Sequence, residues 1–220
     1  MLDSIFQNSM LHPTSGDDEM EMIPPAPSVQ PTPAVVVLGR FQPLHRGHCH
    51  LIHHAAAYRD QHQPEMTLRV MVGSSNREPS PFNPWTWEER IEMIISWLES
   101  ENILNHEVLA VPDLGDEERW VEHAEHWHGR SGVLVTSNES TRELYARAGW
   151  NVEMFGLENR DSLEGWRIRE TLKMLVNSSK EEITAIMSSS VDAPVLKWLL
   201  ADDERVRRLM FLGPSVEHVG

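Results

Sequence analysis

Several features that this sequence lacks narrow its class before any motif is considered. No apolar run among the 220 residues approaches the ~18–20 residues of a membrane span, so no contact with a membrane is expected. The N-terminus also lacks the basic and apolar regions of a signal peptide. Cys49 is the only cysteine, which excludes an internal disulfide framework and favours a reducing, cytoplasmic setting.

Positive charge is also scarce. The sequence has 19 Lys and Arg residues against 34 Asp and Glu, giving a formal net charge of −15. Nucleic-acid binding depends on basic patches over phosphates, so no nucleic-acid partner is expected, although a local pocket for a small phosphate ligand fits this composition. The two commonest phosphate-binding loops, G-x-x-x-x-G-K-[ST] and G-x-G-x-x-G, do not occur.

From Ala34 onward, short apolar runs alternate with longer amphipathic segments. The alternation predicts an α/β fold: a Rossmann-like, doubly wound parallel sheet of about five strands, followed by a helical C-terminal segment. Thr86 and Glu89 have the spacing of a capping box, which marks a helix start. The predicted strands are 34–39, 67–73, 106–111, 132–137 and 151–156, and the predicted helices between them are 47–59, 86–100, 116–127 and 139–149.

The end of the first predicted strand carries an unusual set of residues, in the stretch GRFQPLHRGH. Gly39 lets a backbone or ligand approach closely, and Arg40 adds a fixed positive charge. His45, Gly47 and His48 stand at the start of the next helix, where free N–H groups and the helix dipole favour an anion. In such sheets, ligands bind at the carboxyl ends of the strands. The stretch therefore predicts a polyphosphate site.

The same stretch resembles the signature of the archaeal-type nicotinamide-nucleotide adenylyltransferases, in the H-x-G-H nucleotidyltransferase (cytidylyltransferase-like) superfamily. The resemblance covers residues 34–175. Four further segments carry it: GSSN (73–76), NPWTWEER (83–90), PDLGDEERW (112–120) and TSN (136–138).

The resemblance implies adenylyl transfer from ATP to nicotinamide mononucleotide, which gives NAD and pyrophosphate, with Mg²⁺ carried on the ATP phosphates. It implies that His45, His48 and Arg169 are catalytic, and that no covalent intermediate forms. The ATP and phosphate contacts that it implies are Gly39, Arg40, Phe41, Gln42, Gly47, Asn138 and Ile168. The mononucleotide contacts that it implies are Ser74, Asp113 and Trp120, with the Trp120 indole stacked on the nicotinamide ring.

One motif departs from the family pattern. The family closes its site with S-x-T-x-x-R or S-G-T-x-[IV]-R, in which hydroxyls and an arginine grip the ATP phosphates. The counterpart here, EGWRIR, keeps Arg169 but has Glu164 and Trp166 at the hydroxyl positions, and Ser137 replaces a glycine in TSN. A carboxylate beside a triphosphate is repulsive unless it faces away or binds Mg²⁺.

Composition and resemblance together divide the chain into three segments. Residues 1–33 contain no Lys or Arg and include the proline-rich IPPAPSVQPTP, so we expect a disordered tail; a docking segment for a partner is the alternative. Residues 34–176 are the predicted nucleotidyltransferase domain. Residues 177–220 are a predicted helical C-terminal extension.

Other interpretations stay open at this stage. A different acceptor, such as nicotinic acid mononucleotide or a phosphopantetheine, gives a related nucleotidyltransferase, and the EGWRIR departure motivates a non-catalytic nucleotide-binding module. Trp120 is alternatively a core aromatic residue. His50 and His54 have the spacing of helical metal ligands, but no acidic or cysteine ligand completes a set, so no protein-bound metal is expected. Because the family is often oligomeric, a homo-oligomer is the expected assembly.

Overall fold

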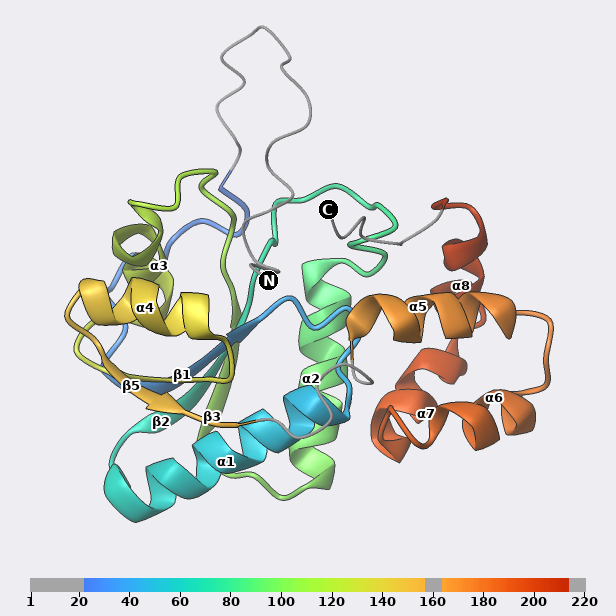
Figure 1. Cartoon of the computed structure of the whole chain (residues 1–220), viewed down its shortest axis with the longest axis horizontal. Coiled ribbons are helices and arrows are strands. Elements are labelled where there is room, and N and C mark those ends of the chain that lie inside the picture. The colour runs from blue at the N-terminus through green and yellow to red at the C-terminus, as the bar shows by residue number, and fades with distance from the viewer. Residues whose placement is uncertain (1–21, 157–163, 214–220) are drawn as a thin grey trace, which may run out of the picture.

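The computed structural model describes residues 22–156 and 164–213, and its five-stranded sheet has the order β3-β2-β1-β4-β5 (Figure 1). All neighbouring strands are parallel. The predicted alternation of strands and helices is confirmed, as is the Rossmann-like class. The elements are β1 (Ala34–Gly39), α1 (Arg46–His62), β2 (Thr67–Val72), α2 (Trp87–Ser100), β3 (His106–Ala110), α3 (Trp120–His128), β4 (Val133–Thr136), α4 (Glu139–Arg147) and β5 (Asn151–Met154).

Alternate residues of β1 face opposite sides of the sheet and join different core clusters. Val35 and Val37 lie in a first cluster with α1 and α2, whereas Ala34 and Val36 lie in a second cluster with α3 and α4. The chain moves from β1 outward to β3, and then returns to β4 on the other side of β1. The strand order therefore reverses between β1 and β4, which is where this fold binds ligands.

The helix ends follow local sequence signals. The predicted capping box is confirmed: Thr86 Oγ1 accepts from the Glu89 N–H at 3.3 Å, and Glu89 Oε2 accepts from the Thr86 N–H at 2.9 Å. Gly149 follows α4 with a φ of 85°, a left-handed conformation that suits glycine after a helix. In the part of the chain that the structure describes, no helix is both long and apolar enough to cross a bilayer.

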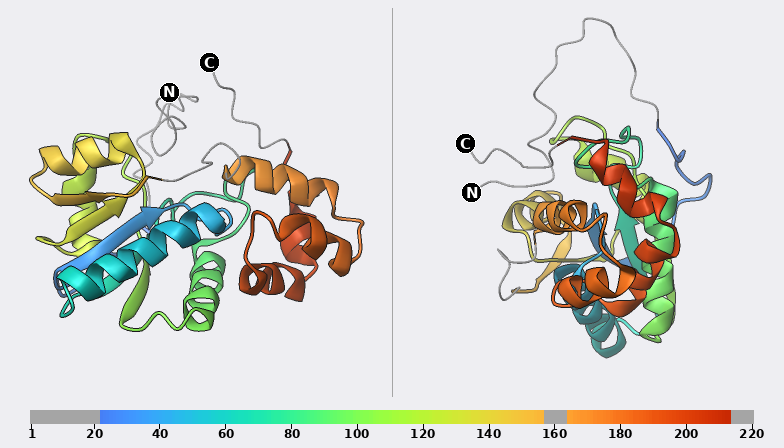
Figure 2. Two further views of the ribbon diagram at one scale, coloured as in Figure 1. Left: turned by 60° about the horizontal axis from the view of Figure 1, so that its bottom comes forward. Right: turned by 90° about the vertical axis from the view of Figure 1, so that its right-hand side faces the viewer.

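The C-terminal helices complete the first core cluster. Ile183, Met187 and Leu199 pack in it beside residues of the sheet, and Trp97 Nε1 donates to Asp192 Oδ2 at 3.1 Å. Figure 2 shows these orange-to-red helices gathered at one end of the molecule, next to α2. The predicted boundary at residue 176 therefore crosses a shared core. The elements are α5 (Gly165–Met174), α6 (Lys180–Met187), α7 (Ala193–Ala201), α8 (Glu204–Arg207) and the 3-10 helix η2 (Arg208–Met210).

The structure differs from the predicted tail where it describes that segment. Residues 1–21 lie outside the described residues, but residues 22–33 contact the domain. Ser75 Oγ donates to the Ile23 carbonyl at 2.5 Å, and Trp127 Nε1 donates to the Pro24 carbonyl at 3.2 Å. A proline-rich stretch has few apolar side chains to bury, but its backbone carbonyls still accept hydrogen bonds. Amino-acid composition does not predict such contacts, because every residue has a carbonyl.

Candidate functional site

The turn after β1 brings several predicted residues to the point where the strand order reverses. A Cβ on Gly39, the last residue of β1, would lie 3.0 Å from the Phe41 ring, so glycine allows this packing. Phe41 has a φ of 51° and is buried, and its ring centroid lies 4.8 Å from that of His48 in an edge-on contact. Gly39 and Phe41 thus shape the turn, and Arg40 brings a positive charge close to His48.

His45 and His48 meet at the start of α1. Their rings are stacked, with centroids 3.7 Å apart and 25° between the ring planes. His45 is only 7% exposed, and the Nδ1 atom of each ring is buried with no hydrogen-bond partner among the residues that the structure describes. Gly47 lies between them in the first helical turn, where backbone N–H groups have no helical partner. The arrangement offers two imidazoles to the oxygen atoms of an anion.

Burial keeps both imidazoles neutral in the free protein. It lowers the pKa of His48 to about 3; Arg40 contributes to this, and the Pro43 backbone opposes it in part. Burial also holds the pKa of His45 well below its usual value, and the neighbouring His48 and Arg169 lower it further. A polyphosphate close to these rings favours their charged forms. Binding of an anion at this site would therefore be coupled to proton uptake.

Acid is expected to destabilise the free protein as the pH falls from about 6.5 toward 3. Because the pKa of His48 is about 3 when folded and ~6.5 when unfolded, the unfolded chain binds a proton that the folded chain excludes in this range. Stability present above pH 6.5 is therefore lost on acidification. Urea unfolding at pH 7.0 and pH 4.5 measures how far the free energy of unfolding falls between these pH values. This fall should be smaller by about 2 kcal/mol in His48→Gln than in the parent.

The exposed His50 provides the control for this comparison. His50→Gln should lose as much stability between the two pH values as the parent does. An equal loss in His48→Gln and the parent would mean that His48 is protonated in the folded protein.

Arg169 reaches the same turn from α5. Its Nη1 donates to the Gln42 carbonyl at 2.8 Å, and its charge lies close enough to His45 to affect that pKa. The Gln42 side chain is bonded elsewhere: Nε2 donates to the Trp85 carbonyl at 2.8 Å, and Oε1 accepts from the Trp85 N–H at 3.1 Å. Gln42 thus links two loops, and Ile168 is buried in the first core cluster. Their predicted contacts with ATP stay predictions.

Ser74 and Asp113 meet at the carboxyl ends of β2 and β3, as residues of one site should. Ser74 Oγ donates to Asp113 Oδ1 at 3.1 Å, and Arg77 Nε lies 2.7 Å from Asp113 Oδ2. The Asn76 side chain bonds both backbone groups of Asp113, at 2.8 and 3.1 Å. This network fixes the turn after β2 against the turn after β3.

Asn138 lies on the other side of β1, whereas Trp120 begins α3, the helix that contacts β3. Asn138 follows β4 and caps α4, because its Oδ1 accepts from the Thr141 N–H at 3.0 Å. Trp120 begins α3, is 3% exposed and belongs to the second core cluster. The structure thus gives Trp120 the core packing that was the alternative interpretation, and its stacking on a pyridine ring stays a prediction.

Arg90 is the residue of this site that sequence reasoning missed. It is 1% exposed, and its Nη1 donates at 2.7 Å to the carbonyls of both Arg40 and Gly73. The residues that follow these two, Phe41 and Ser74, both have left-handed backbones, with φ of 51° and 55°. Arg90 therefore holds the turns after β1 and β2 together where each is strained. Arg90 is the last residue of the NPWTWEER segment, so the motif that includes it was visible in the sequence.

The departure at Glu164 is neutralised within its own motif. Glu164 Oε2 accepts from Trp166 Nε1 and from Arg167 Nε, both at 2.9 Å. The Arg167 guanidinium also lies over the Trp166 ring, 4.5 Å from its centroid. These contacts give the Glu164 carboxylate a cationic partner, which reduces the repulsion expected toward a triphosphate.

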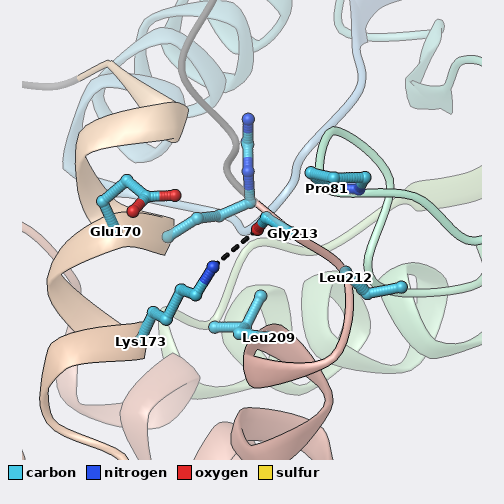
Figure 3. Close-up of a pocket in the computed structure, with 7 residues that line it drawn as sticks. Pro81, Glu170, Lys173, Leu209, Leu212 and Gly213 are labelled. Carbon is cyan, nitrogen blue, oxygen red and sulfur yellow. Dashed lines mark hydrogen bonds between the residues drawn. The ribbon is translucent and has the colours of Figure 1, made fainter.

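Arg169 also lines a small pocket between α5 and η2 (Figure 3). Lys173 Nζ donates across it to the Gly213 carbonyl at 2.6 Å, and so ties α5 to the chain after η2. The other lining residues are Pro81, Glu170, Leu209 and Leu212.

Comparison with known proteins gives consistent matches. The cytidylyltransferase-like family model matches residues 36–185. A nicotinamide-nucleotide adenylyltransferase from Methanococcus maripaludis is 30% identical over 147 residues, which are 67% of this chain and 81% of that protein. One from Thermoplasma volcanium is 28% identical over 175 residues, which are 79% of this chain and 90% of that protein.

Among solved structures, a bifunctional NMN adenylyltransferase/ADP ribose pyrophosphatase from Francisella tularensis is similar, with a TM-score of 0.54 and 20% identity. The match covers 80% of this chain and 52% of that chain. At this identity, the likeness concerns the fold.

Proposed function

We propose that this chain transfers the adenylyl group of ATP to nicotinamide mononucleotide. The premise is that the chain belongs to the cytidylyltransferase-like family and to its nicotinamide-nucleotide adenylyltransferases. The products are NAD and pyrophosphate. The stacked pair His45–His48 carries the proposal, because its buried Nδ1 atoms lie at a helix start beside Arg169.

The reaction needs no covalent intermediate. An oxygen of the mononucleotide phosphate forms a bond to the α-phosphorus of ATP, while the bond from that phosphorus to the bridging oxygen breaks. The bonding electrons leave with pyrophosphate, which gains negative charge. We propose that imidazole N–H groups of His45 and His48 and the guanidinium of Arg169 stabilise this charge.

Mg²⁺ is proposed to enter with ATP, as part of the substrate. Within residues 22–156 and 164–213, no group of three or more His, Cys, Asp or Glu side chains could hold a metal ion. Magnesium usually keeps much of its shell on substrate phosphates and water, with one or two carboxylates. The Glu164 carboxylate, at the start of the helix that carries Arg169, is proposed as a carboxylate of this kind.

A direct assay tests the function. The purified chain is incubated with ATP, Mg²⁺ and one of three acceptors: nicotinamide mononucleotide, nicotinic acid mononucleotide or a phosphopantetheine. We expect one pyrophosphate per NAD with the first acceptor, and a lower kcat/KM with the others. A higher kcat/KM with another acceptor would replace the proposed one, and ATP binding without pyrophosphate release would indicate a non-catalytic module.

Trp120 gives a prediction that separates core packing from ligand stacking. Because it is 3% exposed, Trp120→Ala should lower the free energy of unfolding by about 3–5 kcal/mol. Trp120→Phe restores much of the volume and should cost far less. If the pyridine ring stacks on the indole, Trp120→Phe should still raise the KM for the mononucleotide severalfold and leave the KM for ATP unchanged.

Trp150 in the same core cluster is the matched control. Trp150→Phe should lower the melting temperature without changing either KM. Equal KM values for Trp120→Phe and the parent would return Trp120 to a purely structural role.

A further inference from the structure

We propose that residues 22–33, here called the strap, belong to the catalytic domain and position its acceptor side. The proposal rests on the proposed function, because the residues that the strap holds are those assigned to the mononucleotide. Figure 1 shows the strap as the blue segment that runs past α3 into β1. Its role is that of a positioning segment, which acts through other residues.

The first anchor of the strap is the turn after β2. Ser75 Oγ donates to the Ile23 carbonyl at 2.5 Å. Ser75 lies between Ser74, which donates to Asp113 at 3.1 Å, and Asn76, which bonds both backbone groups of Asp113. The strap thus adds a fixed point to the turn that carries the proposed mononucleotide contacts, next to the left-handed Ser74.

The second anchor is α3, the helix that begins with Trp120. Trp127 Nε1 donates to the Pro24 carbonyl at 3.2 Å, and Met22 packs against the core cluster that contains Trp120 and Trp127. Two adjacent strap carbonyls, of Ile23 and Pro24, therefore hold the turn after β2 and α3 in one relative position. These two elements supply Ser74 and Trp120.

The C-terminal half of the strap is fixed by a close approach. A Cβ on Gly129, which has a φ of 83°, would lie 2.6 Å from the Pro31 carbonyl oxygen and 2.8 Å from that of Thr32. Arg69, buried on β2, donates from Nη1 to the Thr32 carbonyl and to the His128 carbonyl, both at 2.8 Å. The domain therefore has both a space and a donor that match the strap.

A pair of glycine variants tests the proposal. Gly129 and Gly149 both have positive φ, 83° and 85°, and both follow a helix, but a Cβ on Gly149 meets nothing within 4 Å. Both variants place an alanine at a positive φ, and the ψ of 179° makes Gly129 the more restrictive position; only Gly129→Ala also brings a Cβ against the strap. We expect Gly129→Ala to raise the KM for nicotinamide mononucleotide about tenfold, the equivalent of one or two lost hydrogen bonds, with the KM for ATP unchanged. Gly149→Ala should change neither KM.

Two truncations test the proposal independently, because they introduce no side chain at a position with a positive φ. Removing residues 1–21 keeps every strap contact described above and should leave both KM values unchanged, whereas removing residues 1–33 should reproduce the Gly129→Ala defect. Ser75→Ala, which removes one anchor, should raise the mononucleotide KM about threefold. An unchanged mononucleotide KM in both Gly129→Ala and the longer truncation, or a rise already in the shorter one, would overturn the proposal.

Hydrogen exchange separates failure of this proposal from failure of the proposed function. Backbone amides of residues 74–76 should exchange faster in Gly129→Ala than in Gly149→Ala, whether or not the chain makes NAD. If the parent makes no NAD, the proposed function fails, and faster exchange would still support the strap contact. Equal exchange in the two variants would contradict the strap even in an active enzyme.

Discussion

His48→Ala is expected to lower kcat by about 10²–10³-fold, because a single pre-positioned donor to developing charge supplies an effect of this size. His45→Ala should lower kcat similarly, since its ring stacks on that of His48 at 3.7 Å and its Nδ1 is equally buried. The effect should appear in kcat more than in the KM for ATP, because the charge on pyrophosphate increases in the transition state. Steady-state kinetics with both substrates measures it.

The double variant sharpens this prediction. Because the stacked rings are proposed to act on the same phosphates, His45→Ala/His48→Ala should lower kcat much less than the product of the two single effects. His50→Ala, at an exposed position of the same helix, should keep the parent kcat. Turnover near that of the parent in both single variants would remove the histidine pair from the mechanism.

Arg90→Met is expected to be strongly destabilising, with a loss of about 3–5 kcal/mol in the free energy of unfolding. Methionine fills most of the space but leaves the buried carbonyls of Arg40 and Gly73 without a donor, and each such carbonyl costs ~1–3 kcal/mol. The left-handed Phe41 and Ser74 would then lose the contact that holds them. Urea unfolding measures the loss.

The variant should also impair catalysis beyond its effect on stability. Assays at 10 °C, where the variant stays folded, should show lower kcat/KM for both substrates. Arg90 joins the turn after β1, which is proposed to bind ATP, to the turn after β2, which is proposed to bind the mononucleotide. Arg147→Met, at an exposed position of α4, should change neither stability nor activity by a measurable amount. An active, destabilised Arg90→Met would make Arg90 a core residue without a role in the site.

Local signals explain why so much of this fold could be read from the sequence. β-branched runs such as Val35–Val37 and the capping box at Thr86 act within a few residues, so the sequence alone predicts them. The H-x-x-H pair could also be placed, because a strand end and a helix start fix where its side chains meet. Each of these features depends on neighbours along the chain.

Features that depend on distant backbone groups could not be read in this way. Arg90 binds carbonyls 50 and 17 residues away, and any residue type supplies a carbonyl. The contacts of Ile23 and Pro24 are of the same kind, because Ser75 and Trp127 donate hydrogen bonds to the backbone carbonyls of these two residues. The burial of Trp120 likewise depends on the other residues of the second core cluster, and the residue type alone does not predict this packing.

The bonds between the first turn and the last helices also constrain how the protein can be made. Arg46, which starts α1, donates from its backbone N–H to the Ser190 carbonyl at 2.9 Å and from Nε to Asp192, 146 residues later. Trp85 Nε1 donates to the Arg205 carbonyl, 120 residues later. A ribosome therefore releases the turn after β1 long before it releases the helices that bond to it. The nascent chain carries Trp85 and Trp97 without their partners during that interval, so this part of the fold is completed only after the C-terminal helices have left the ribosome.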